Sequence, residues 1–176
     1  MESLSVRIAR GETALDTFDK KRRRKRKKKE PPPQWFETIT RMDLFSMKMV
    51  GECLLGQIFG HYQTGLTKLG IDPKDAAYFG FASPSLSEYP AMTEMWYEQI
   101  HARLQKKVEA LIVPQGCAFA GFCPLSVGSH GDNRAYLPGV YIRFPHSMSM
   151  EERGLIATNI INKVKGITRV LMEIET

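Results

Sequence analysis

Ten consecutive basic residues carry the clearest chemistry in this sequence. They are Lys20, Lys21, Arg22, Arg23, Arg24, Lys25, Arg26, Lys27, Lys28 and Lys29. Lysine and arginine release the counterions that phosphates condense, so affinity rises with the number of contacts and falls with salt. Near an anionic lipid surface each base contributes about 1 kcal/mol, and such a run is also typical of a nuclear import signal. The run therefore predicts a negatively charged partner and leaves RNA, lipid and an import receptor open.

The basic excess of the chain is confined to this run. The net charge is +6, while residues 1–19 carry two bases and four acids and residues 30–176 carry 13 bases and 15 acids. Ten like charges repel one another and do not fold compactly. The apolar residues before the run are sparse and are interrupted by Gly11. We therefore expect residues 1–34 to form a disordered, protease-sensitive arm that is basic and proline-rich.

Three prolines follow the run and lead into an aromatic residue. Pro31, Pro32 and Pro33 favour an extended polyproline II segment, and Gln34 and Trp35 complete it. We interpret this segment as a stiff spacer between the arm and the rest of the chain. The alternative is that it docks into a groove of the WW or SH3 type, which binds such segments.

The other reactive side chains do not form a recognisable catalytic or metal-binding motif. Cys117, Cys123 and His130 are close in sequence, but five residues separate the two cysteines, whereas zinc ligands typically lie two to four residues apart. The four histidines accompany no GxSxG, HExxH or phosphate-binding GxxxxGK[ST] motif. We therefore predict free cysteines in a reducing compartment, no metal, no cofactor and no enzymatic activity. No apolar stretch is long enough for a membrane-spanning helix.

Residues 35–176 predict one compact α+β domain. Helices are expected over residues 54–69 and 91–110 and after Ser149, which is a typical N-cap before two glutamates. The clearest is the helix over 91–110, whose apolar face includes Trp96 and Leu104. Strands are expected over 45–49, 76–82, 116–127 and 135–144 and after Gly166. The expected fold is a mostly antiparallel sheet with about three helices, preceded by the disordered arm.

The chain resembles a rhabdovirus matrix protein of the plant cytorhabdovirus type. The shared features are a basic arm, a proline triplet with an aromatic residue, and an α+β body. Residues 20–35 carry most of this resemblance, and the sequence FSMKM at 45–49 is compatible with the start of the family's body. Animal members of the family carry a PPxY late motif that recruits WW-domain budding factors. The matching positions here are Pro32, Pro33, Gln34 and Trp35, so the segment is late-motif-like but ends in tryptophan.

The resemblance implies a non-enzymatic viral matrix protein. Such a protein self-associates, condenses the viral ribonucleoprotein and bridges it to the envelope as a peripheral membrane protein. It is found in the virion, in the host cytoplasm and at membranes, and its basic run is compatible with entry into the nucleus. The alternative is a nuclear nucleic-acid-binding protein that uses Lys20 to Lys29 for import and for phosphate contacts. An enzyme without a recognisable motif is the third hypothesis.

Overall fold

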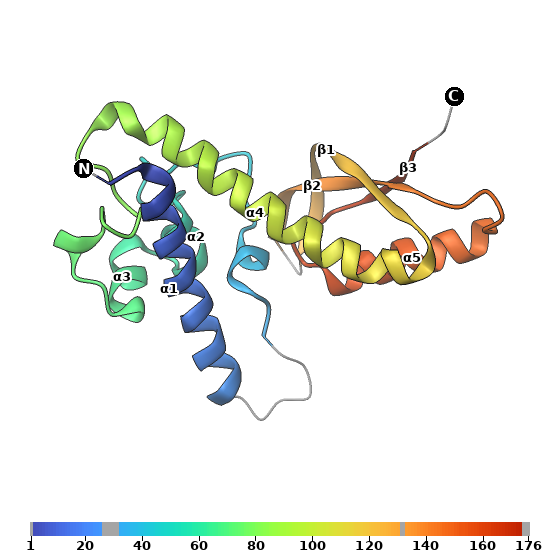
Figure 1. Ribbon diagram of the computed structural model, residues 1–176, viewed down its shortest axis with the longest axis horizontal. Coiled ribbons are helices and arrows are strands. Elements are labelled where there is room, and N and C mark those ends of the chain that lie inside the picture. Colours follow the sequence, from blue (N-terminus) through green and yellow to red (C-terminus); the bar gives the residue numbers. More distant parts are fainter. Residues whose placement is uncertain (1, 26–31, 131–132, 174–176) are drawn as a thin grey trace. The chain divides into compact units, whose positions relative to one another are not determined.

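A computed structural model describes residues 2–25, 32–130 and 133–173 (Figure 1). The contacts divide the chain into two compact units. One unit comprises Met1–Ile39 and Leu44–Ile100, and the other comprises Thr40–Asp43 and His101–Thr176. The residues before residue 35 belong to the first unit.

The fold class is α+β, as predicted, with more helix and a different sheet than expected. The α-helices of the described part are α1 (Leu4–Lys25), α2 (Leu54–Phe59), α3 (Tyr62–Leu69), α4 (Tyr89–Ile112) and α5 (Met150–Lys163). The strands are β1 (Ala118–His130), β2 (Asn133–Arg143) and β3 (Val170–Met172). Short 3-10 helices span Trp35–Thr38, Pro73–Asp75, Leu86–Glu88 and Val113–Gln115.

Helix α1 replaces most of the arm that was expected to be disordered. Its side chains Ile8 and Leu15 are buried in the first unit. Gly11 lies between them, where a Cβ atom would collide with the carbonyl oxygen of Phe79 and approach the Trp96 ring to 2.9 Å. The glycine that interrupts the apolar pattern is therefore the point of closest packing. A helix of marginal intrinsic stability forms here because its narrow apolar stripe packs on the rest of the unit.

Two segments that were expected to be strands are turns. Phe45 and Met47 are buried as the alternation predicts, but Met49 is 52% exposed and residues 45–49 pair with no strand among the described residues. In residues 76–82, Gly80 has a φ of 65°, a left-handed conformation that turns the chain. The helical pattern over 54–69 is divided by Gly60, whose φ of 82° ends α2. Alternating apolar residues here mark a buried loop instead of a sheet.

Helix α4 confirms the clearest prediction from the sequence. It covers the expected range of 91–110, and Trp96 and Leu104 are fully buried. Residues 89–100 of the helix belong to the first unit and residues 101–112 to the second. Trp96 stacks on Phe81 at 5.6 Å and donates a hydrogen bond from Nε1 to the Gly80 carbonyl oxygen at 2.7 Å. The aromatic core of the first unit therefore rests on this helix.

The second unit contains a mixed three-stranded sheet in the order β1-β2-β3. Strands β1 and β2 form an antiparallel hairpin, with irregular pairing between Phe119 and Gly121 and between Cys123 and Ser126. Strand β3 pairs with β2 in the parallel direction, so the expectation of a mostly antiparallel sheet was wrong. Parallel pairing is possible because α5 crosses over between the two strands, and α5 packs beside β3 (Figure 1).

The predicted cap of α5 is confirmed in detail. The Ser149 hydroxyl accepts a hydrogen bond from the Glu152 amide at 3.2 Å, and the Glu152 carboxylate accepts one from the Ser149 amide at 2.8 Å. This reciprocal capping box satisfies amides that the first turn of a helix leaves without partners. Gly166 follows the helix and packs closely on Leu104, because a Cβ atom at Gly166 would lie only 2.5 Å from Leu104 Cδ2.

Candidate phosphate-binding interface

The first part of the basic run forms the last turns of α1. Lys20, Lys21, Arg23 and Arg24 are exposed there. The structure does not describe the side chain of Lys25, and Arg26, Lys27, Lys28 and Lys29 lie outside the described residues. Cations are favourable at the C-terminal end of a helix because the last carbonyl groups carry partial negative charge. This explains why a run of like charges is compatible with a helix, contrary to the expectation that it would prevent folding.

Arg22 differs from its neighbours because it is used inside the protein. Its side chain is 28% exposed and forms an ion pair with Asp19 at 2.9 Å. The Arg22 guanidinium also donates a hydrogen bond to the Pro33 carbonyl oxygen. The interaction joins the end of α1 to the chain that follows the basic run. Arg22 therefore has a structural role in the first unit.

Trp35 anchors the chain after the basic run to α1. Its backbone amide donates to Asp19 Oδ2 at 2.7 Å, and its indole Nε1 donates to Asp16 Oδ1 at 2.9 Å. Burial raises the pKa of the Asp19 carboxyl, and the hydrogen bond from Trp35 acts in the opposite direction. The Trp35 ring itself is buried against Phe36 and Trp96 at centroid distances of 5.6 and 6.1 Å.

This anchor changes the interpretation of the proline segment. Pro32 is buried, Pro33 is exposed and Gln34 is half-buried, while the Trp35 side chain lies in the core. A partner groove of the WW or SH3 type could not reach that ring without unfolding the contact. The end of the segment is held by two carboxylates of α1.

A shallow groove of about 220 Å³ runs along α1 beside the exposed bases. Its polar side chains come from Arg10, Thr13, Thr17, Lys21 and Lys68, and its apolar side chains come from Ala14, Phe18, Leu69 and Phe79. None of these nine lining residues is acidic. The α1 members recur every three or four residues and therefore share one face of the helix.

The three cations of the groove are held to different degrees. Arg10 pairs with Glu2 at 2.9 Å, and its guanidinium lies 3.3 Å from the centroid of the Tyr78 ring. Lys21 and Lys68 are exposed, and within the described residues neither forms an ion pair with a carboxylate. The charge of Arg10 is thus largely compensated, whereas Lys21 and Lys68 can meet an anionic ligand.

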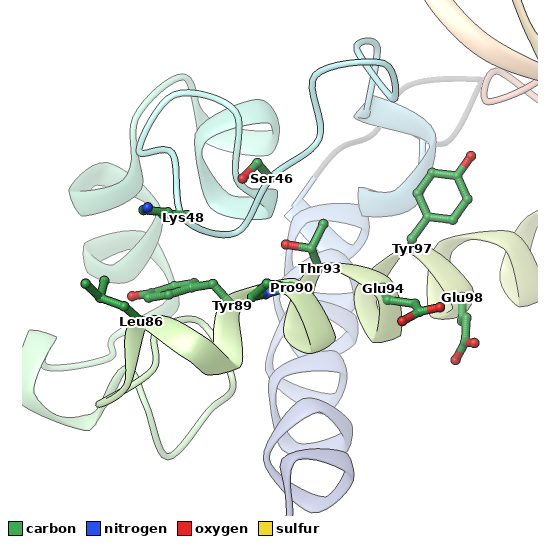
Figure 2. A pocket seen from close by; sticks show the side chains of 9 residues that line it. All are labelled: Ser46, Lys48, Leu86, Tyr89, Pro90, Thr93, Glu94, Tyr97 and Glu98. Atoms are coloured by element: carbon green, nitrogen blue, oxygen red, sulfur yellow. The ribbon is translucent and has the colours of Figure 1, made fainter.

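A second, larger hollow of about 570 Å³ lies along the first half of α4. Figure 2 shows Lys48 near Leu86 and Tyr89, while Glu94 and Glu98 lie further along the helix. Ser46 and Thr93 supply hydroxyl groups, but Thr93 Oγ1 already accepts a hydrogen bond from the Met47 amide at 3.0 Å. No histidine or cysteine lines this hollow.

The structure describes two of the three side chains considered for a zinc site, those of Cys117 and Cys123. Cys53, Cys117 and Cys123 are free and buried, as predicted for the latter two. The side chain of His130 lies outside what the structure describes. Over the residues that are described, no three His, Cys, Asp or Glu side chains come together in a way that could hold a metal ion.

His101 is the histidine with the most altered environment. Its ring stacks on Phe122 with 4.1 Å between the centroids, and burial lowers its pKa to about 4. His61 and His146 are exposed, and the His61 ring caps α3 by accepting from the Gln63 amide. We interpret His101 as a packing residue, because its ring stacks on Phe122 and its burial disfavours the charged form of the ring.

The environment of His101 predicts a loss of stability in mild acid. Because the pKa is about 4 in the folded protein and near 6.5 in an unfolded chain, the unfolded state takes up the proton first. The stability that depends on a neutral His101 is therefore fully present above pH 6.5 and is lost as the pH falls towards 4. Urea denaturation at pH 7.0 and 5.0 should show that His101→Phe, which keeps the stacked ring, reduces this loss. The control His146→Phe should not; an unchanged pH dependence in His101→Phe would contradict the prediction.

Comparison with models of protein families finds no match, and comparison with curated proteins finds none either. No helix in the described ranges combines the length and the apolar character needed to cross a membrane.

The sequence indicated the bases of this interface but missed its groove. Phe18 and Lys21 share a face with Arg10 and Thr17, a spacing that is visible in the sequence once α1 is recognised as a helix. Lys68 and Phe79 come from segments far along the chain. No local pattern marks either residue as a neighbour of the basic run.

Proposed function

We propose that the protein is a non-enzymatic viral matrix protein that binds RNA and anionic membrane surfaces through the C-terminal part of α1. In this role it self-associates, condenses a viral ribonucleoprotein and bridges it to the envelope. The observation that carries the proposal is the group of four exposed bases, Lys20, Lys21, Arg23 and Arg24, beside a groove without acidic residues.

The arrangement supports binding of a phosphate-rich polymer for two reasons. The bases project from a helix that is packed into its unit, so little conformational freedom of the backbone is lost when they bind. They are also followed in sequence by five further basic residues, Lys25 to Lys29, which extend the positive charge. The affinity of such a surface comes from the number of phosphates contacted and does not depend on base sequence.

The alternative is a nuclear nucleic-acid-binding protein. The same continuous run of lysine and arginine is typical of import signals. The two functions differ in what else the protein binds. A matrix protein is expected to bind anionic vesicles as well as RNA, whereas a nuclear protein is expected to bind nucleic acid and to accumulate in the nucleus without membrane binding.

Salt titration and vesicle flotation test this proposal. We expect the logarithm of the affinity for a single-stranded RNA to fall linearly with the logarithm of the salt concentration, with a slope of about −3 or steeper. That slope corresponds to about 0.7 for each of at least four phosphates contacted. Vesicles containing phosphatidylserine should carry the protein upward in a density gradient, and neutral phosphatidylcholine vesicles should not. An affinity independent of salt, or no binding to RNA and anionic vesicles, would refute the proposal.

A further inference from the structure

We propose that the groove along α1 binds an unstacked base of a single-stranded nucleic acid, with Lys21 and Lys68 contacting the flanking phosphates. This inference rests on the proposed function and adds the class of ligand that the interface prefers. It assigns a binding role to Phe18 and Phe79, which the basic run alone does not suggest.

The charges around the groove fit a phosphodiester chain. Lys21 and Lys68 both line it, so its lysines come from two different helices, α1 and α3. Thr13 and Thr17 are exposed on the same face of α1. The Thr13 hydroxyl donates to the Ala9 carbonyl at 2.9 Å and keeps its lone pairs for a ligand donor such as an amino group or a ribose hydroxyl.

The aromatic residues of the groove provide the surface for a base. Phe18 and Phe79 are each half-buried, so part of each ring is held in place and part is accessible. Phe59 contacts Phe18 edge-on, with 5.2 Å between centroids and an angle of 78° between the rings. Tyr78 contacts Phe79 in the same manner at 5.3 Å and 83°. Lys68 Nζ itself lies 5.5 Å from the centroid of the Phe59 ring. Held aromatic rings beside lysines are the arrangement with which proteins bind single strands irrespective of sequence.

Single strands fit this arrangement better than duplexes or lipids do. The bases of a duplex are stacked and paired, so they cannot reach a groove of about 220 Å³ on the side of a helix. An anionic lipid headgroup could contact Lys21 and Lys68 but has no flat ring to cover the two phenylalanines. The combination of cations and accessible aromatic surface therefore favours single-stranded nucleic acid.

The test compares a polymer that carries nucleobases with one that carries only phosphates. The full chain is titrated with fluorescent oligouridylate, and the bound oligomer is displaced in a second assay with inorganic polyphosphate. Replacing both rings, in Phe18→Leu/Phe79→Leu, should weaken oligouridylate binding about fivefold or more. The affinity for polyphosphate should change less than twofold. The variant Lys21→Gln/Lys68→Gln should weaken the binding of both polymers, because both present phosphates.

Matched controls separate the groove from general effects. Tyr141→Leu removes an exposed aromatic ring from β2, and Lys48→Gln removes an exposed lysine outside the groove; both should bind like the wild type. Thermal melting checks that each variant folds. Where the double leucine variant does not fold, nuclear magnetic resonance of the wild-type protein with labelled phenylalanine rings gives the answer. Ring signals should shift on addition of oligouridylate and stay in place with polyphosphate.

The outcomes distinguish this inference from the function on which it rests. A wild-type protein that binds neither polymer would refute both. Equal loss of oligouridylate and polyphosphate binding in the leucine variant, or no loss of either, would overturn the base-binding groove and leave phosphate binding intact. If Phe18→Leu/Phe79→Leu loses binding to phosphatidylserine vesicles but binds oligouridylate as the wild type does, the occupant of the groove is a lipid. That result would overturn the inference.

Discussion

Replacing Lys20, Lys21, Arg23 and Arg24 with glutamine is expected to weaken RNA binding by on the order of 10²–10³-fold near 0.1 M salt. Each lost phosphate contact removes about 0.7 from the slope of affinity against salt for a single strand, so the slope should become shallower by about 3. Glutamine has a helix propensity close to that of lysine and arginine, so α1 should persist. Arg22 is retained because it pairs with Asp19 and donates to the Pro33 carbonyl.

A variant with the same change in net charge is the control for this experiment. Lys48, Lys74, Lys106 and Lys163 are exposed and lie outside the basic run. Replacing these four lysines with glutamine should leave the slope within about one unit of the wild type, since none of them belongs to the interface. Fluorescence anisotropy at several salt concentrations measures both variants. Equal losses in the two variants would show that net charge, and not the end of α1, determines binding.

Replacing Trp35 with alanine is expected to lower the free energy of unfolding by about 3–5 kcal/mol. The buried ring packs on Phe36 and Trp96, and its loss leaves a cavity in the core of the first unit. The variant also removes the indole donor of Asp16, while the backbone amide that donates to Asp19 is retained. Urea denaturation followed by circular dichroism measures the change.

Trp35→Phe separates packing from the hydrogen bond. This variant keeps an aromatic ring but has no indole N–H for the half-buried carboxylate of Asp16. Trp35→Phe should lower the free energy of unfolding by about 1–3 kcal/mol, because the Asp16 carboxylate loses a hydrogen-bond donor. This loss should be smaller than that of the alanine variant. If the free energy of unfolding of Trp35→Ala lies within about 0.5 kcal/mol of the wild-type value, Trp35 behaves as a surface residue and does not anchor the chain.

Helices and strands with strong local patterns were predictable from the sequence. The apolar face of α4, with Trp96 and Leu104, extends over five turns, and the Ser149 cap consists of neighbours in the chain. The hairpin of β1 and β2 follows from two apolar segments that flank a short polar loop. In each case the information lies within about 20 residues, so no knowledge of the tertiary structure is needed.

The remaining structure depends on contacts between distant residues. Gly11 reads as a helix breaker, but it makes room for Trp96, which is far along the chain. The parallel pairing of β3 with β2 depends on the path of α5 and not on the composition of β3. For the same reason the sequence pointed to the basic residues of the candidate interface but not to the structural role of Arg22, nor to the positions of Lys68 and Phe79 in the groove.

The irregular pairing of β1 has a consequence for how copies of the protein can assemble. In the described part of the sheet, β1 is a border strand of 13 residues, and a long regular border invites the addition of a strand from another molecule. The breaks in register around Gly121 and after Cys123, together with Pro124, which lacks an N–H group, interrupt the row of donors and acceptors. Fibril growth by strand addition is thereby disfavoured at this border.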